Sequence, residues 1–174
     1  AAVGERGHLR MGFIGSATFE LLPRVVQLVH SQLPNVDLEL TESTTSEICT
    51  QLIQGSFDAG LLRYPLAQAQ GLGLLPLHRD RFVAAIPASN PLAKRKHIKL
   101  IELQHESFIQ YRAASVPGLH AVTMLACQQA GFVPQVQQHA NQVQTQVSLV
   151  QAGLGVALVP SVAARTPTTG VAFV

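Results

Sequence analysis

Apolar and polar residues follow one another along this chain with periods that change from segment to segment. Residues 9–14 form a short apolar run, which predicts a buried strand. Beyond it, apolar residues recur at spacings of three and four, which predicts a helix from about residue 19 that ends before Pro34. The apolar positions of this helix are Phe19, Leu22, Val26, Val29 and Leu33.

The next segments keep this order of strand and helix. Residues 36–40 alternate apolar and polar side chains and predict a second strand. Thr44 and Glu47 have the spacing of a capping box, which predicts the start of a second helix with Ile48, Leu52 and Ile53 facing inward. Gly55 ends this helix, and residues 57–62 predict a third strand.

The pattern changes near two prolines. Strands are predicted at 72–77 and 82–86, and Pro87 and Pro91 then mark a crossing into a second lobe. Strands and helices alternate again beyond this point. The predicted strands are 108–111, 134–139 and 156–159, and the predicted helices are about 116–130, one capped by Asn141, and a short one at 161–164.

Two successive βαβαβ arrangements predict an α/β fold with mostly parallel sheets covered on both faces. The first lobe is predicted to contain residues 1–86 together with 161–174, and the second lobe residues 87–160. In such sheets a ligand binds at the carboxyl ends of the strands, where helix N-termini converge.

Composition narrows the classes of function. Of the 174 residues, 47% are hydrophobic and 13% charged, so a folded core is expected. The formal charge of +2 is too small for electrostatic binding of nucleic acid, and the basic run 94–99 is interpreted as a solvated loop. Cys49 and Cys127 are predicted to be reduced thiols in a cytoplasmic protein. The sequence shows neither a run of 18 apolar residues nor a signal peptide, so no contact with a membrane is expected.

Three predicted strand ends in the first lobe carry similar chemistry. The first strand leads into Ser16, Ala17 and Thr18, the second leads into Ser43, Thr44, Thr45 and Ser46, and the third ends at Arg63. Hydroxyl groups at helix N-termini beside a guanidinium suit an anion such as a carboxylate. Two alternatives remain open: the hydroxyl groups serve only as helix caps, and Arg63 pairs with a carboxylate of the protein itself.

The second lobe offers Tyr111, Arg112, Ser115 and Asn141 at equivalent strand ends. The alternatives are that Tyr111 only closes a core and that Asn141 only caps a helix. Catalytic groupings are not recognisable, because the seven histidines are dispersed and no serine lies in a G-x-S-x-G turn. Gly12-x-x-Gly15 is shorter than a dinucleotide fingerprint. We therefore predict no metal, no cofactor and no enzymatic activity.

Several motifs occur in an order that resembles the effector-binding domain of LysR-type transcription regulators over roughly residues 4–165. They are Leu22-Pro23, Pro34 with Leu38-Glu39-Leu40, Gly55-x-x-Asp58-Ala59-Gly60, Pro87-x-x-x-Pro91-Leu92-Ala93, and Gly153-Leu154-Gly155 followed by Pro160-Ser161. The resemblance implies two Rossmann-like lobes joined by two crossovers, as in periplasmic binding proteins, with an effector cleft between them. It also implies a homodimer or homotetramer that contacts promoter DNA only through an N-terminal helix-turn-helix domain, which these residues do not contain.

Gly12-Phe13-Ile14-Gly15-Ser16, Leu21-Leu22-Pro23-Arg24 and Asp58-Ala59-Gly60 followed by Arg63 are most similar to the branch that regulates degradation of aromatic compounds in response to benzoate or muconate. This similarity implies that the positions of Ser16 and Thr45 bind effector carboxylates. It implies further that Pro117 and Leu119 lie where relatives carry a bulky aromatic residue that lines the cleft. The rival interpretations are a solute-binding protein of a transport system, a small α/β enzyme, and an interaction module that binds no effector.

Overall fold

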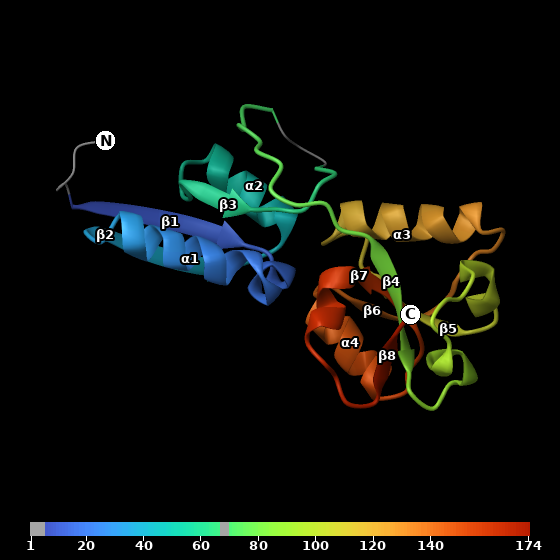
Figure 1. Ribbon diagram of the computed structural model, residues 1–174. Coiled ribbons are helices and arrows are strands. Elements are labelled where there is room, and N and C mark those ends of the chain that lie inside the picture. Colours follow the sequence, from blue (N-terminus) through green and yellow to red (C-terminus); the bar gives the residue numbers. More distant parts are fainter. Residues whose placement is uncertain (1–5, 67–69) are drawn as a thin grey trace. The chain divides into compact units, whose positions relative to one another are not determined.

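The computed structural model describes residues 6–66 and 70–174, and within it the chain forms two compact units that meet in sequence between Leu75 and Pro76 (Figure 1). The first unit contains strand β1 (Gly7–Phe13), the 3-10 helix η1 (Gly15–Phe19), helix α1 (Leu21–Gln32), strand β2 (Val36–Glu42), helix α2 (Thr45–Ile53) and strand β3 (Ala59–Leu61).

The three strands of the first unit form a parallel sheet in the order β2-β1-β3. Its register pairs Gly7 with Val36 at one end and Phe13 with Leu61 at the other. One face packs against α1 through a core cluster that contains Met11, Phe13, Ala17 and Leu61, with Leu21, Leu22 and Val25 of the helix beside it. This is the parallel βαβαβ unit that the hydrophobic pattern predicts.

The opposite face of this sheet lies so close to α2 that two strand positions must be glycine. A Cβ atom on Gly12 would lie 2.6 Å from Cε2 of Phe57, and one on Gly60 would lie 2.7 Å from Cγ2 of Ile48. The missing side chains allow Ile48, which is 0% exposed, to approach the strands directly. This close packing holds the N-terminus of α2 at the edge of the sheet where the strands end.

The apolar positions of both helices extend past the core at their C-terminal ends, and the prediction that Ile53 points inward is wrong. Leu33 follows the end of α1 and is 46% exposed, and Ile53, the last residue of α2, is 54% exposed. Within α1, whose residues are all described, none is fully buried. A small sheet covers only the central turns of each helix, so the apolar period continues beyond the surface that the core can bury.

The second unit contains strand β4 (Phe82–Pro87), the 3-10 helices η2 (Pro91–Lys94) and η3 (Leu100–Leu103), strand β5 (Ser107–Tyr111), helix α3 (Pro117–Gln129), strand β6 (Gln135–Ala140), helix α4 (Val143–Gln151), strand β7 (Ala157–Pro160), the 3-10 helix η4 (Ser161–Arg165) and strand β8 (Val171–Phe173). A core cluster in this unit joins β4 to β5 and α3, and includes Ile86, Leu103, Phe108, Cys127 and Val156.

The sheets of this unit differ from the mostly parallel arrangement that the sequence predicts. β5 and β6 are parallel, but β4 lies antiparallel between β7 and β8. Residues 76–86 and 161–174, assigned above to the first lobe, cluster with the second compact unit, in which β4 pairs with β7 and β8. β8 was not predicted, because three residues give too short a period to recognise.

The strand predicted at 72–77 is wrong. Within the described part of the chain, residues 72–81 form no strand. Leu74, Leu75 and Leu77 are 51%, 79% and 56% exposed, so the apolar run that suggested a buried strand packs against no core here. A strand is defined by its hydrogen-bonded neighbour, and local hydrophobicity does not supply one. Asp80, next to this segment, instead accepts hydrogen bonds from the hydroxyl of Ser161 and the backbone N–H of Val162.

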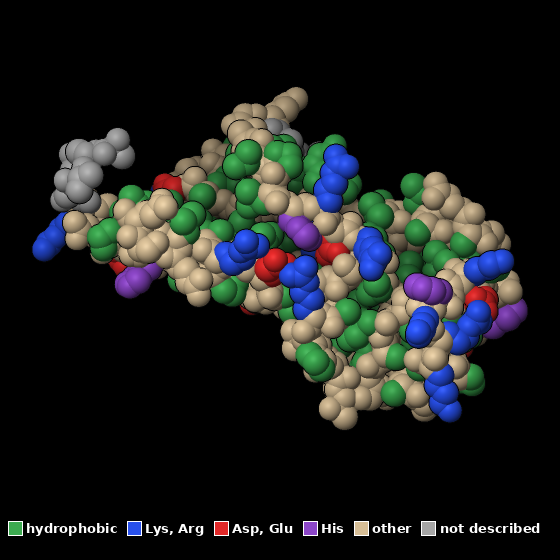
Figure 2. Space-filling model, viewed as in Figure 1, with side chains coloured by type: hydrophobic (Ala, Val, Ile, Leu, Met, Phe, Trp, Pro, Cys, Tyr) green, Lys and Arg blue, Asp and Glu red, His purple; other side chains and the backbone are tan. Residues whose placement is uncertain are grey.

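On the face shown in Figure 2, Lys, Arg, His and acidic side chains are spread over both units, and several of them gather on the second unit. The residues of the basic run 94–99 border an open hollow of about 550 Å³ lined by Arg95, His97, Ile98, Lys99 and Glu102. Arg95 pairs with Glu102, which also accepts a hydrogen bond from the backbone N–H of Lys99. These pairs are half-exposed, which agrees with the interpretation of the run as a solvated loop.

Candidate functional site

The carboxyl ends of all three parallel strands of the first unit are joined by backbone hydrogen bonds. The N–H of Ser43 donates to the carbonyl of Phe13 over 2.9 Å, and the N–H of Ile14 donates to the carbonyl of Leu61 over 3.2 Å. The segments that follow the strands therefore start from one edge of the sheet. This is the position at which ligands bind in parallel α/β sheets.

Arg63 connects the side chains at this edge. Its Nη2 atom donates to Oγ of Ser16 over 2.8 Å, and its backbone N–H donates to Oγ1 of Thr45 over 3.4 Å. Ser16 is only 7% exposed, and Thr45 and Arg63 are half-buried. The structure thus brings together three of the residues that the sequence singled out, one from each strand end.

These contacts fix the roles of the two hydroxyl groups. Each hydroxyl oxygen accepts a hydrogen bond from Arg63, so each keeps its own hydrogen to donate. A guanidinium that binds a hydroxyl oxygen also makes that hydroxyl a stronger donor, because hydrogen bonds in a chain polarise one another. The arrangement suits an oxygen-rich anion.

Thr44 has a different role from its neighbour. It caps α2 in a complete capping box: its Oγ1 accepts from the N–H of Glu47 over 3.3 Å, and its own N–H donates to Oε2 of Glu47, also over 3.3 Å. The predicted capping box is therefore confirmed. The hydroxyl groups of Ser43 and Thr44 both donate to the same Oε2 atom.

Glu47 is consequently a fixed carboxylate at the N-terminus of α2. The hydrogen bond from the hydroxyl of Ser43 lowers the pKa of Glu47, and the backbone and hydroxyl bonds from Thr44 lower it further. The sequence pattern identified Glu47 as part of a cap, but not as the acceptor of three donors. Ser43 was predicted as one of the hydroxyl residues after the second strand, but its hydrogen bond to Glu47 was not.

Ala17 and Thr18 lie at the same strand end with different surroundings. Ala17 is 4% exposed and packs into the core cluster of Met11 and Phe13. Thr18 is exposed, and its hydroxyl donates to the carbonyl of Gly15 over 2.6 Å, within the single turn of η1.

In the second unit, the predicted site residues follow the parallel strands β5 and β6. The N–H of Arg112 donates to the carbonyl of Ala140 over 3.4 Å, which places Arg112 beside the start of Asn141. Ser115 lies in the turn after Arg112 and donates its N–H to that residue's carbonyl over 3.1 Å. Pro117 is the first residue of α3, and Leu119 lies in its first turn.

Asn141 is exposed and does not cap a helix, so that prediction is wrong. Among the described residues, α4 begins at Val143 after Gln142, and no side chain makes a capping hydrogen bond there. Tyr111 is 0% exposed, in agreement with a role in closing the core of its unit. Beside it, Gln110 is also buried, and its Oε1 accepts from the hydroxyl of Thr123 over 2.7 Å, a polar pair that the sequence did not indicate.

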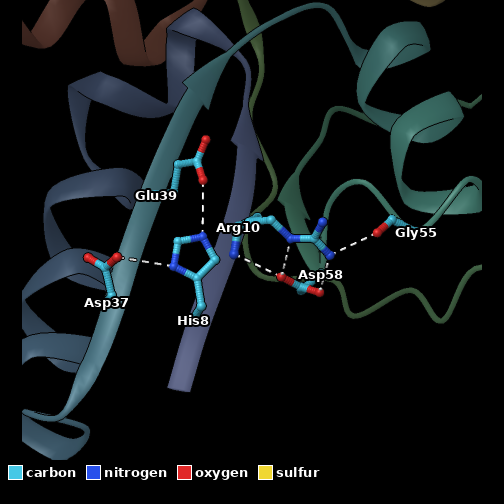
Figure 3. Close-up of polar contacts among 6 residues, drawn as sticks. All are labelled: His8, Arg10, Asp37, Glu39, Gly55 and Asp58. Atoms are coloured by element: carbon cyan, nitrogen blue, oxygen red, sulfur yellow. Dashed lines mark hydrogen bonds and ion pairs between the residues drawn. The ribbon is translucent and has the colours of Figure 1, made fainter. Parts of the chain in front are cut away.

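A second cluster of charged residues lies nearer the amino ends of the strands in the first unit (Figure 3). His8 lies between two carboxylates, with Nδ1 3.1 Å from Asp37 and Nε2 3.1 Å from Glu39. Arg10 donates from its backbone N–H, Nε and Nη2 to the carboxylate of Asp58, and from Nη2 to the carbonyl of Gly55. Figure 3 shows that these contacts tie β1 to β2 on one side and to the segment before β3 on the other.

The side chains that could bind a metal ion or undergo oxidation are dispersed or buried in the described part of the chain. No group of three or more His, Cys, Asp or Glu residues there is placed to hold a metal ion. Cys49 and Cys127 are buried, and burial raises the pKa of each thiol. None of the helices in this part of the chain combines the length and the apolar character that a membrane span requires.

Solved effector-binding domains share this fold. The effector-binding domain of BenM with benzoate matches 97% of this chain and 76% of its own, with a TM-score of 0.81 and 30% identity. The effector-binding domain of QuiR in complex with shikimate has the same TM-score at 20% identity, which shows the fold alone. The α/β, periplasmic-binding-protein-like fold class is therefore confirmed.

The sequence comparisons give the family. Residues 2–171 match the model of the LysR substrate binding domain, and the chain belongs to this family. It is 36% identical over 164 residues to the HTH-type transcriptional regulator AlsR of Bacillus subtilis (strain 168), covering 94% of this chain and 54% of AlsR. It is 32% identical to TtuA of Agrobacterium vitis, covering 95% and 55%, and 33% identical to BenM of Acinetobacter baylyi, covering 88% and 51%. The chain thus spans about half the length of these relatives.

Proposed function

We propose that this chain is the effector-binding part of a LysR-type transcription regulator and that it senses a small carboxylate. The observation that carries this proposal is the bonded group of Ser16, Thr45 and Arg63 at the strand ends of the first unit. The hydroxyl groups of Ser16 and Thr45 donate to the two oxygens of the carboxylate, and Arg63 supplies the positive charge. The relatives' names support the regulatory role, since AlsR, TtuA and BenM are all transcriptional regulators.

The class of effector rests on the chemistry of this group and on one solved relative. The effector-binding domain of BenM is solved with its effector benzoate, a ring carboxylate. For this chain we propose an aromatic acid or a muconate-like acid. Arg112, Ser115, Pro117, Leu119 and Asn141, at the strand ends of the second unit, remain predicted contacts for the rest of the effector.

The effector acts through a shift in population. It favours one conformation of the regulator only by the free energy of contacts made in that conformation and not in the other. In the whole protein this shift changes how a homodimer or homotetramer presents its DNA-binding domains to a promoter in the cytoplasm. Leu28 and Leu33, at 54% and 46% exposure, with Leu40 on β2, give the first unit apolar surface for a second copy. The family match does not favour the transport or enzyme alternatives.

A thermal-shift panel tests the proposal. Benzoate, muconate, chloromuconate, salicylate and simple aliphatic acids are each titrated onto the chain. A ligand at a hundred times its Kd stabilises the fold by about 2.7 kcal/mol, which raises Tm by roughly 5 to 10 °C in a chain of this size. Ser16→Ala and Thr45→Ala should abolish most of the rise.

Ser31→Ala is the matched control. Its hydroxyl donates only to the carbonyl of Leu28 on the exposed face of α1, so the shift should persist. A folded chain that responds to none of the acids would refute the carboxylate-sensor proposal. An unchanged shift in Ser16→Ala and Thr45→Ala would place the effector elsewhere.

A further inference from the structure

The strand ends of the first unit carry more negative charge than positive. Residues 13–18, 42–47 and 59–63 are all described, and together they contain one cation, Arg63, and two carboxylates, Glu42 and Glu47. A monocarboxylate bound there would therefore meet one cation and two resident acids in these segments. A second carboxylate on the same effector would find no further cation among these three segments.

Glu47 is the more firmly held of the two acids. Its Oε2 atom accepts from the hydroxyl of Ser43, from Oγ1 of Thr44 over 3.1 Å and from the backbone N–H of Thr44 over 3.3 Å. These donors keep the carboxylate ionised at neutral pH and prevent it from turning away. It occupies the positive end of α2, which would otherwise attract an anion from outside.

The free donors at these strand ends are sufficient for one carboxylate. Ser16 and Thr45 each accept from Arg63 and retain one hydroxyl hydrogen. The two hydroxyl groups match the two oxygens of a single carboxylate group, whereas those of Ser43 and Thr44 are already bound to Glu47.

From this arrangement we propose that Glu47 is a specificity-determining residue, whose charge disfavours effectors that carry a second carboxylate close to the strand ends of the first unit, such as muconate. The inference rests on the proposed function and narrows its effector class. For the estimate, the second carboxylate of the effector is taken to lie about 8 Å from Glu47, which is within one Debye length at physiological salt. At an effective dielectric constant between those of water and of a protein surface, their repulsion changes affinity by roughly 2- to 30-fold.

Matched pairs of acids test this inference, with Kd measured by isothermal titration calorimetry. Sorbate and muconate share a six-carbon diene, and benzoate and terephthalate share a benzene ring. Each pair differs in the number of carboxylates. The variant is Glu47→Gln, because glutamine at this position retains a capping box while it removes the charge. Glu39→Gln makes the same change of charge on β2 away from the strand ends, where Glu39 contacts His8, and serves as the control.

The unmodified chain should bind each monocarboxylate more tightly than its dicarboxylate partner. Glu47→Gln should reduce that ratio by roughly 2- to 30-fold, the reduction should shrink in high salt, and Glu39→Gln should leave the ratio unchanged. Equal ratios in the unmodified chain and in Glu47→Gln would overturn the inference while the proposed function stands. A preference of the unmodified chain for dicarboxylates would also overturn it. Failure of every acid to bind the unmodified chain would overturn both.

Discussion

Arg63 donates from Nη2 to Oγ of Ser16 over 2.8 Å, a bond between residues 47 positions apart in the sequence. It connects the end of β3 to the end of β1, and the backbone N–H of the same arginine connects β3 to Thr45 on α2. A single residue thus determines how three segments of the first unit present their polar groups.

Replacing Arg63 with lysine should weaken binding of the effector. Lysine keeps the positive charge, but its ammonium lacks the planar group of donors that contacts Ser16. We expect Kd to rise by about 10- to 100-fold, which corresponds to the loss of a hydrogen bond to a charged group. Calorimetry with the tightest acid of the panel gives the measurement. Arg24→Lys, at an exposed pair with Glu20, is the control, and equal affinity in both variants would contradict the role of Arg63.

Gly12→Ala should destabilise the first unit. The new Cβ would lie 2.6 Å from Phe57 and 3.0 Å from Ile48, both side chains of the packed face. Overpacking of this kind costs about 1 to 3 kcal/mol, so Tm should fall by several degrees. Gly73→Ala serves as the control, since nothing lies within 4 Å of its Cβ position. Equal melting of the two variants would show that α2 can move away from the sheet.

Gly155→Ala should destabilise the second unit more than Gly153→Ala. Gly155 has φ of +146°, and its Cβ would lie 2.2 Å from the backbone oxygen of Ser107, which belongs to β5. Gly153 also has positive φ, +79°, but nothing lies near its Cβ position. We expect a loss of about 1 to 2 kcal/mol for Gly153→Ala and about 3 kcal/mol or more for Gly155→Ala. Urea denaturation measures both, and equal losses would be inconsistent with the close approach to β5.

Asp58 should make the first unit less stable in acid. The hydrogen bonds from the side chain and backbone of Arg10 lower the pKa of Asp58 from 3.8 to about 2 in the folded chain. Because the folded pKa is below the unfolded one, this stabilisation is fully present above pH 3.8 and is lost as the pH falls toward 2. The unfolding free energies of the unmodified chain and of Asp58→Asn should therefore converge in this window. A difference that stays constant with pH would exclude this linkage.

His8 should have the opposite dependence. The hydrogen bond to Glu39, followed by that to Asp37, raises the pKa of His8 above 6.5, although desolvation opposes the shift. The protonated ring donates to both carboxylates, whereas the neutral ring has one N–H. The stabilisation is thus present below pH 6.5 and is lost as the pH rises through the folded pKa. We expect the difference in stability between the unmodified chain and His8→Gln to decline as the pH rises from 6 to 9, which is roughly the range in which such a histidine titrates. Thermal unfolding at each pH gives the measurement. A difference in stability that does not depend on pH would argue against this role of the contacts of His8 with Asp37 and Glu39.

Local patterns in the sequence predicted most of the elements. The capping box of Thr44 and Glu47, the glycine at the end of α2 and the alternation of residues 36–40 each depend on neighbours in the chain. These interactions are the same in a short segment as in the folded protein, so the sequence alone indicates them. The errors fall where a distant partner decides. Residues 72–77 have the apolar character of a strand without a neighbouring strand in the described structure, and Ile53 continues a helical stripe past the edge of the sheet.

The sequence by itself determined the α/β class, the family and the candidate residues Ser16, Thr45 and Arg63, because motifs and hydrophobic periods record local structure. Only the tertiary structure showed that Arg63 contacts Ser16 and Thr45, that β4 pairs antiparallel within the second unit, and that Glu47 gathers the hydroxyl groups of Ser43 and Thr44. Sequence spacing cannot reveal which donor reaches which acceptor, because that depends on how strands distant in the chain align and how closely the helices pack on them.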